Sequence, residues 1–216
     1  MLDGVFVNAY LPPALDKKEV LRYAGCKETD EGVEALLNEC LEECETVFTY
    51  RVCYRVFEKD EFLKIFGGGS KALGKNLGGC AYAVAFAATV GLPIDRLIAK
   101  YASVRAVKSL LFQAIGAERI EALCDLFCED IKARAREKGF FTRPRFSPGY
   151  GDFPLQTQTA LLQALDASRK LGLSLTESLL MTPTKSVTAV VGLSDKEGFV
   201  KKACENCLKS DCELRK

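Results

Sequence analysis

The sequence contains no histidine among its 216 residues. A Ser-His-Asp or Cys-His catalytic system therefore cannot be built within this chain, and neither can a zinc hydrolase site with histidine ligands. The same absence means that the chain supplies no histidine ligand to a cobalt or haem centre. A cofactor of that kind would take its histidine ligand from another molecule.

Net charge is also nearly missing, because 30 lysines and arginines stand against 29 aspartates and glutamates. A formal net charge of +1 creates no long-range attraction to nucleic acid or to an anionic membrane, so we expect neither as a partner. The sequence shows no signal-peptide pattern, and it has no apolar run near the roughly 20 residues that span a bilayer. We therefore expect a cytoplasmic protein whose partners are small molecules or other proteins.

The chain is 48% hydrophobic, which is enough for a sizeable core. Helix-forming residues dominate residues 17–44, and the β-branched and aromatic residues of 46–57 predict a strand. The alanine-rich stretch 81–90 predicts a closely packed buried helix, which Gly91 and Pro93 would end.

Helical patterns continue in the second half of the chain. Apolar positions recur at helical spacing from Leu97, and we expect Gly116 to interrupt them before a second helix that runs to about Lys138. Gly139 is a suitable cap for that helix. A later group of leucines marks one face of another helix that ends near Gly172.

Residues 175–181 and 186–193 flank a short Thr-Pro-Thr-Lys segment and predict a β-hairpin, because the second segment alternates as a half-buried strand does. The fold class that follows is α+β, with helices packed around a small antiparallel sheet. We expect one domain over residues 1–195 and a cysteine-rich tail over residues 196–216.

One segment comes close to a phosphate-binding loop. Residues 69–76 read GSKALGKN, but Asn76 stands where a Ser or Thr would hold magnesium. No clear strand leads into the segment, and the spacing of Leu73 and Leu77 is typical of the buried face of a helix. We therefore predict a packed helix here rather than a phosphate site.

Ten cysteines in a reducing compartment indicate packing, metal ligation or redox chemistry rather than disulfides. Cys40 with Cys44, and Cys124 with Cys128, are each four residues apart on predicted helices, so each pair shares a helix face. A pair of this kind could grip a metal ion, but packing in the core is the interpretation that we favour.

The tail places Cys204, Cys207 and Cys212 within nine residues. A CxxC pair is the usual first half of a zinc or iron–sulfur site. Three thiolates are one short of a closed site, so a fourth ligand would come from Cys26, Cys53 or elsewhere in the chain, from a partner, or from an exogenous ligand at an open iron. The alternative is a reduced tail that is sensitive to oxidation.

An acidic stripe is predicted on the helix that ends near Lys138. Glu121, Asp125 and Glu129 repeat at a spacing of four residues, which places them on one face. Such a stripe is usually a solvated surface. It could also meet the cationic sulfonium or the ribose of a ligand.

Residues 145–154 read RFSPGYGDFP and form a loop rich in Pro and Gly. Arg145 offers a planar fork that suits a carboxylate, and Pro148 with Gly149 can turn backbone amides and carbonyls toward a ligand. Tyr150 adds a ring with a polar end. These groups suit an amino acid and the hydroxyls of an adenosine, although an Arg and a Tyr can also simply hold a turn in place.

The same residues resemble a known family. RFSPGY, a following helix and then LTESLLMTPTKSVTAVVGLS (175–194) are similar in order and spacing to the activation domain of vitamin B12-dependent methionine synthase. The resemblance implies that Arg145 holds the carboxylate of S-adenosylmethionine, that the backbone at Ser147 meets the adenine, and that Tyr150 lies beside the ligand. It also implies that Glu121 contacts the amino group.

The implied role is to assist reductive remethylation of cobalamin. When cob(I)alamin is oxidised to cob(II)alamin, an electron donor such as flavodoxin or ferredoxin reduces it, and S-adenosylmethionine supplies the methyl group. The sequence is too short for homocysteine, folate and cobalamin modules, so we expect action on a separate methionine synthase or other corrinoid protein, and not the synthesis of methionine by this chain alone.

Two alternatives remain open at this point. The chain could be an iron–sulfur or zinc-binding redox module that acts on a corrinoid protein through its cysteine tail. It could also be a docking protein that only forces a corrinoid partner into the conformation for reactivation.

Overall fold

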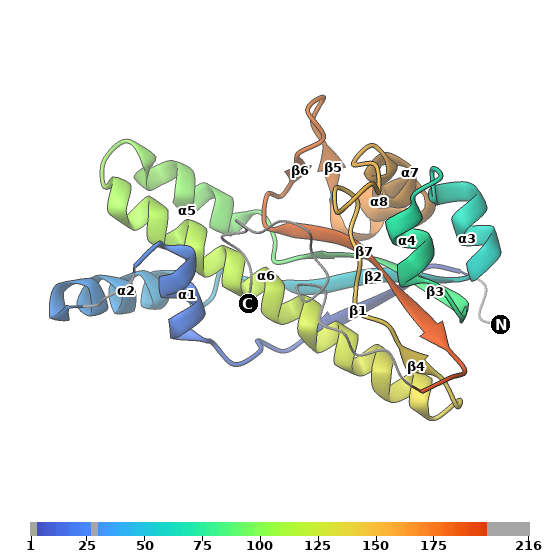
Figure 1. Ribbon diagram of the computed structural model, residues 1–216. Coiled ribbons are helices and arrows are strands. Elements are labelled where there is room, and N and C mark those ends of the chain that lie inside the picture. Colours follow the sequence, from blue (N-terminus) through green and yellow to red (C-terminus); the bar gives the residue numbers. More distant parts are fainter. Residues whose placement is uncertain (1–3, 27–29, 198–216) are drawn as a thin grey trace.

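A five-stranded sheet lies at the centre of the protein, in a computed structural model that describes residues 4–26 and 30–197 (Figure 1). Its strand order is β1-β2-β3-β7-β4, and every neighbouring pair is antiparallel. The α+β class predicted from the sequence is therefore confirmed. The strands are β1 (Phe6–Tyr10), β2 (Tyr50–Glu58), β3 (Cys80–Thr89), β4 (Phe141–Thr142) and β7 (Ser186–Ser194), and β5 (Ser174–Leu175) pairs with β6 (Met181–Thr182) in a separate two-stranded sheet.

Helices cover both faces of the large sheet (Figure 1). One face carries α1 (Lys17–Tyr23), α2 (Glu31–Cys44), α5 (Pro93–Ala102) and α6 (Ala106–Arg136). The other face carries α3 (Lys59–Phe66), α4 (Lys71–Asn76), α7 (Thr157–Ala164) and α8 (Ala167–Leu171). In the described part of the chain, no helix is long and apolar enough to cross a membrane.

The prediction of a buried helix over residues 81–90 is wrong, because this stretch is the central strand β3. Val84 and Phe86 pack toward α6, whereas Ala83, Ala85 and Ala87 pack into the cluster on the opposite face. A strand that is buried on both sides loses the alternation of polar and apolar residues, so its sequence looks like that of a buried helix.

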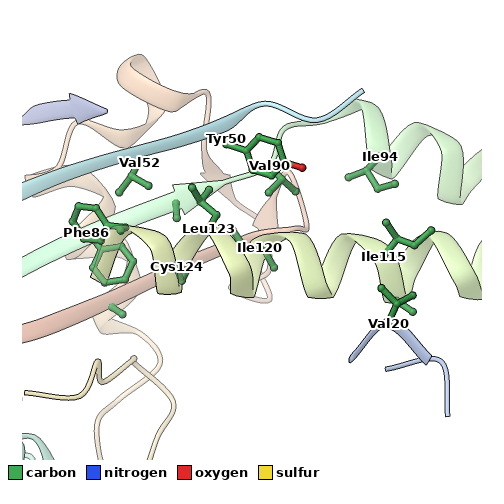
Figure 2. Close-up of a cluster of buried hydrophobic side chains, with 14 of the residues drawn as sticks. Val20, Tyr50, Val52, Phe86, Val90, Ile94, Ile115, Ile120, Leu123 and Cys124 are labelled. Atoms are coloured by element: carbon green, nitrogen blue, oxygen red, sulfur yellow. The ribbon is translucent and has the colours of Figure 1, made fainter. Parts of the chain in front are cut away.

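Helix α6 runs across one face of the sheet and supplies much of that face's core. Leu123 points from α6 toward the strands, whereas Ile115 lies near Ile94 of α5 (Figure 2), and the rings of Phe127 and Phe86 are 4.7 Å apart. The cluster buries these side chains almost completely. This packing fixes the position of α6 relative to the sheet.

The predicted interruption at Gly116 is also wrong, since α6 continues through it and the break lies at residues 103–105. A Cβ atom at Gly116 would lie 2.9 Å from Cγ of Lys185. The glycine therefore allows the Lys185 side chain to pack against the helix, and it does not end the helix. The predicted cap at Gly139 is confirmed, because this residue has a φ of 77° just after α6.

The predicted hairpin of residues 175–181 and 186–193 does not form. The second segment is β7, which pairs with β3 and β4, and the first contains the end of β5 and the start of β6, which pair with each other. The alternating pattern identified β7 as a strand correctly. It carried no information on the strand's partner.

Three other predictions are confirmed in outline. The helical region 17–44 forms two helices, α1 and α2, and each begins at an aspartate whose carboxylate accepts hydrogen bonds from backbone amides. The strand predicted at 46–57 is β2. The helix ending near Gly172 is divided into α7 and α8 by Asp166, which has a φ of 48°.

Candidate functional site

The segment before RFSPGY continues β4 along the edge of β7. The amide of Arg143 donates to the carbonyl of Gly192 at 2.8 Å, and Phe146 exchanges two backbone hydrogen bonds of 2.9 Å with Val190. Successive side chains of an extended segment point to opposite faces. Arg145 therefore points toward α6, whereas Phe146 packs on the cluster of the other face.

The chain then turns sharply away from the sheet. The amide of Gly149 donates to the carbonyl of Phe153 at 2.8 Å, and the amide of Tyr150 donates to the carbonyl of Ser147 at 3.2 Å. Gly149 and Gly151 have φ values of 92° and 56°, which residues with side chains rarely adopt. The loop that the sequence predicted is thus a closed turn.

Arg145 reaches two carboxylates of α6. Its Nη2 atom donates to Oε2 of Glu121 at 2.5 Å, and its Nη1 atom lies 3.2 Å from Oδ1 of Asp125. Nη1 is buried and has no hydrogen-bond partner among the described residues. The structure therefore brings together Arg145 and two residues of the predicted acidic stripe.

Two thiols lie beside this ion pair. Burial raises the pKa of Cys128 to about 11, although the positive charge of Arg145 acts in the opposite direction. Burial also raises the pKa of Cys124 well above its usual value. Both thiols are therefore neutral at physiological pH, and Arg145 carries the positive charge of this part of the site.

Ser147, Gly149 and Tyr150 lie on the turn that follows Arg145. The Tyr150 side chain is exposed by 61%, and its ring meets Phe146 edge to face at 6.1 Å. Phe146 in turn stacks on Phe153, which is buried. Tyr150 is therefore exposed to solvent, while its ring packs against Phe146, which is held by the buried Phe153.

A residue that the sequence analysis missed anchors this turn. Asp152 accepts hydrogen bonds from the hydroxyl of Ser70 at 2.6 Å and from the amides of Lys71 and Ala72 at 2.9 and 3.0 Å. These bonds lower the pKa of Asp152, and the bond from Ser70 contributes the most. The start of α4, which resembles a phosphate-binding loop, therefore binds a carboxylate of the same chain.

No group of three or more potential metal ligands occurs among residues 4–26 and 30–197. The predicted ligands Cys204, Cys207 and Cys212 lie outside the described residues. Cys40 and Cys44 are buried in the core beneath α6, which agrees with the packing interpretation.

A groove of about 490 Å³ lies elsewhere, between α7, α8 and β5. Its polar lining residues include Gln163 and Asp166, and its apolar lining residues include Leu173. None of the five predicted ligand residues lines it. The groove and the loop around Arg145 are therefore separate features of the surface.

The sequence matches the model of one protein family, described as the activation domain of vitamin B12-dependent methionine synthase, over residues 74–199. No curated protein shows a significant match. Solved structures do match, including a crystal structure of the MetH reactivation domain bound to AdoHcy, with a TM-score of 0.61 and 18% sequence identity. That match covers 91% of this chain and 80% of the other, and it supports the same fold.

Proposed function

Because the chain belongs to the family of the activation domain of vitamin B12-dependent methionine synthase, we propose that it binds S-adenosylmethionine and assists the reductive remethylation of cobalamin. The cobalamin would be carried by a separate methionine synthase or another corrinoid protein. The observation that supports this role most directly is Arg145, which lies at the start of a closed turn and faces two carboxylates of α6.

The charges around Arg145 complement those of the proposed ligand. S-adenosylmethionine carries one carboxylate, one ammonium group and one sulfonium group. Arg145 would donate to the carboxylate from Nη1, which makes no hydrogen bond in the described part of the chain, while Glu121 and Asp125 place negative charge near the two cationic groups. Opposite charges attract each other more strongly where water is partly excluded. The Arg145 side chain is only 25% exposed, so its attraction to a ligand carboxylate is weakened less by water than that of a fully exposed arginine.

The turn offers the contacts for the adenosine. The backbone at Ser147 and Gly149 would meet the adenine, and the exposed ring of Tyr150 would lie beside the ligand. Covering an exposed aromatic ring removes apolar surface from water, which favours binding. The chain's own task is then to hold the methyl donor in one orientation.

The chemistry of methyl transfer belongs to the cofactor, because reduced cobalt supplies the electron pair that accepts the methyl group. The electron would come from a donor such as flavodoxin or ferredoxin. No general base is required of this chain, so the lack of histidine is compatible with the role. The residues around Arg145 bind and orient the donor, and they exclude part of the water.

Isothermal titration calorimetry with S-adenosylmethionine tests the proposal. We expect the wild type to bind and Arg145→Ala to bind at least about 30-fold more weakly, since removing one partner of a partly buried charge pair costs about 2 kcal/mol or more. The matched control is Arg169→Ala, which removes an arginine that is 81% exposed and pairs with Asp166. A wild type that does not bind, or equal affinity in Arg145→Ala, would refute the assignment.

The cysteine tail supports a second candidate, an iron–sulfur or zinc-binding redox module that acts on a corrinoid protein. Cys204, Cys207 and Cys212 provide three thiolates within nine residues. Metal analysis and visible absorbance of anaerobically purified protein, compared with Cys204→Ser, test this candidate. A colourless and metal-free wild type would remove it.

A further inference from the structure

Helix α4 is hydrogen-bonded to both flanks of the RFSPGY loop. On the C-terminal flank, the carboxylate of Asp152 joins Ser70 and the first two amides of α4, at 2.6 to 3.0 Å. Gly151 also lies close to α4, since a Cβ atom there would be 3.0 Å from Cβ of Ala72. The loop therefore rests directly on the start of this helix.

The N-terminal flank is joined to the other end of α4. The Nδ2 atom of Asn76 donates to the carbonyl of Pro144 at 3.2 Å, one residue before Arg145. Just beyond the helix, the carbonyl of Gly78 accepts a bond of 3.2 Å from Nη2 of Arg143. The six residues of α4 thus span the loop from one side to the other.

The helix itself is fixed to the core. Leu73 and Leu77 have no exposed surface and belong to the cluster on this face of the sheet. The hydroxyl of Ser70 accepts a hydrogen bond from the amide of Leu73 at 3.0 Å and caps the helix. A helix of this length is not stable alone, so its position depends on the core beneath it.

We propose that α4 is a brace for the ligand loop and that Ser70, Asn76 and Asp152 are positioning residues. The inference rests on the proposed function, because it assigns to these residues the task of holding residues 145–150 in shape before S-adenosylmethionine arrives. A loop that is ordered in advance loses less conformational freedom on binding, which increases affinity without any new contact to the ligand. The GSKALGKN segment thereby has a role other than phosphate binding.

Calorimetry with S-adenosylmethionine gives the first test. Asp152→Ala removes all three bonds to α4, and we expect its Kd to rise about tenfold. Asp152→Asn keeps one acceptor oxygen, so its Kd should lie between those of the wild type and Asp152→Ala. Asn76→Ala removes the weaker contact and should raise the Kd about threefold.

The matched control is Asp30→Ala. Asp30 also begins a helix and accepts a bond from the amide of Val33 at 2.8 Å, but it belongs to α2 and has no contact with the loop. Its Kd should equal that of the wild type. Unchanged affinity in Asp152→Ala, or an equal loss in Asp30→Ala, would overturn the brace.

Amide hydrogen exchange of the free protein separates this inference from the proposed function. The amide of Gly149 is bonded to the carbonyl of Phe153 within the turn. We expect Asp152→Ala to accelerate its exchange and Asp30→Ala to leave it unchanged. Unchanged exchange in Asp152→Ala overturns the brace, whereas faster exchange with a wild type that does not bind S-adenosylmethionine supports the brace and refutes the proposed function.

Discussion

Both faces of the large sheet are apolar at the centre, but they differ in the charges that they bury. Among the described residues, the three buried side chains with a charge are Lys108, Glu118 and Arg119, and all of them belong to α6. The opposite face buries neutral polar groups such as Ser70 and Gln158. Arg145 points toward the α6 face, so its charge lies on the face where the protein buries other charges.

The difference indicates a division of tasks. The α6 face arranges charges that complement a ligand, whereas the opposite face provides a rigid apolar support that includes α4. Changes on the supporting face should therefore alter stability more than ligand affinity, except at residues that contact the loop.

Among these variants, Phe62→Ala should lower the free energy of unfolding the most. Phe62 is fully buried on the supporting face, where it packs against Phe57 and Phe66. The cavity should lower the free energy of unfolding by about 4 kcal/mol, measured by urea denaturation. The Kd of the folded protein for S-adenosylmethionine should stay within about twofold of the wild type. A large loss of affinity would show that the two faces are not separate in function.

Glu118→Gln should lower the free energy of unfolding by the next largest amount. Glu118 accepts hydrogen bonds from Nε and Nη2 of Arg119 at 2.5 and 2.6 Å, and both side chains are buried. The change leaves the charge of Arg119 without its partner, so we expect a loss of about 3 kcal/mol in the free energy of unfolding. Urea denaturation measures it, and a loss below about 1 kcal/mol would contradict a buried charge pair on this face.

The ion pair between Lys108 of α6 and Glu43 should make the stability of the protein depend on pH. The Nζ atom of Lys108 donates to Glu43 at 2.7 Å, and this bond is the largest cause that lowers the pKa of Glu43 from its usual 4.5 to about 2. A carboxyl whose pKa is lower in the folded state stabilises the fold above its unfolded pKa, and the contribution is lost as the pH falls toward the folded pKa. Stability should therefore decrease between pH 4.5 and 2.

The control for this dependence is Glu43→Gln, which should have a flatter profile of stability against pH over the same range. Thermal unfolding at a series of pH values measures both proteins. Identical profiles would mean that the bond between Lys108 and Glu43 does not contribute.

Arg169→Ala should change the free energy of unfolding the least. The ion pair of Arg169 with Asp166 is 2.7 Å long, but the arginine side chain is 81% exposed. Exposed pairs contribute little, so the free energy of unfolding should change by less than about 0.5 kcal/mol. Ligand affinity should not change either. A loss of affinity would instead place the ligand in the groove that Asp166 lines.

The sequence predicted the fold class and the loop, but it mistook the central strand for a helix. Ala83, Ala85 and Ala87 face one cluster while Val84 and Phe86 face the other, and a run of apolar residues does not reveal that two faces are covered. The wrong break at Gly116 has a similar cause. The reason for that glycine is the side chain of Lys185, which is distant in the sequence.

The candidate site was predictable where its residues are adjacent in the chain. Arg145, Ser147, Gly149 and Tyr150 form one motif, and the resemblance added Glu121, which the structure places against Arg145. Asp152 was not predictable in its role, because its partner Ser70 lies 82 residues away. Long-range hydrogen bonds of this kind leave no local pattern in a sequence.

Chemical-shift mapping by NMR can locate the S-adenosylmethionine site residue by residue. When S-adenosylmethionine is added to the protein, we expect the amide signals of Glu121, Asp125 and residues 147–151 to shift, and those of Gln163 and Ser168 in the groove to stay unchanged. Shifts confined to the groove, or no shifts at all, would contradict the assignment of Arg145, its partners on α6 and the following loop as the ligand site.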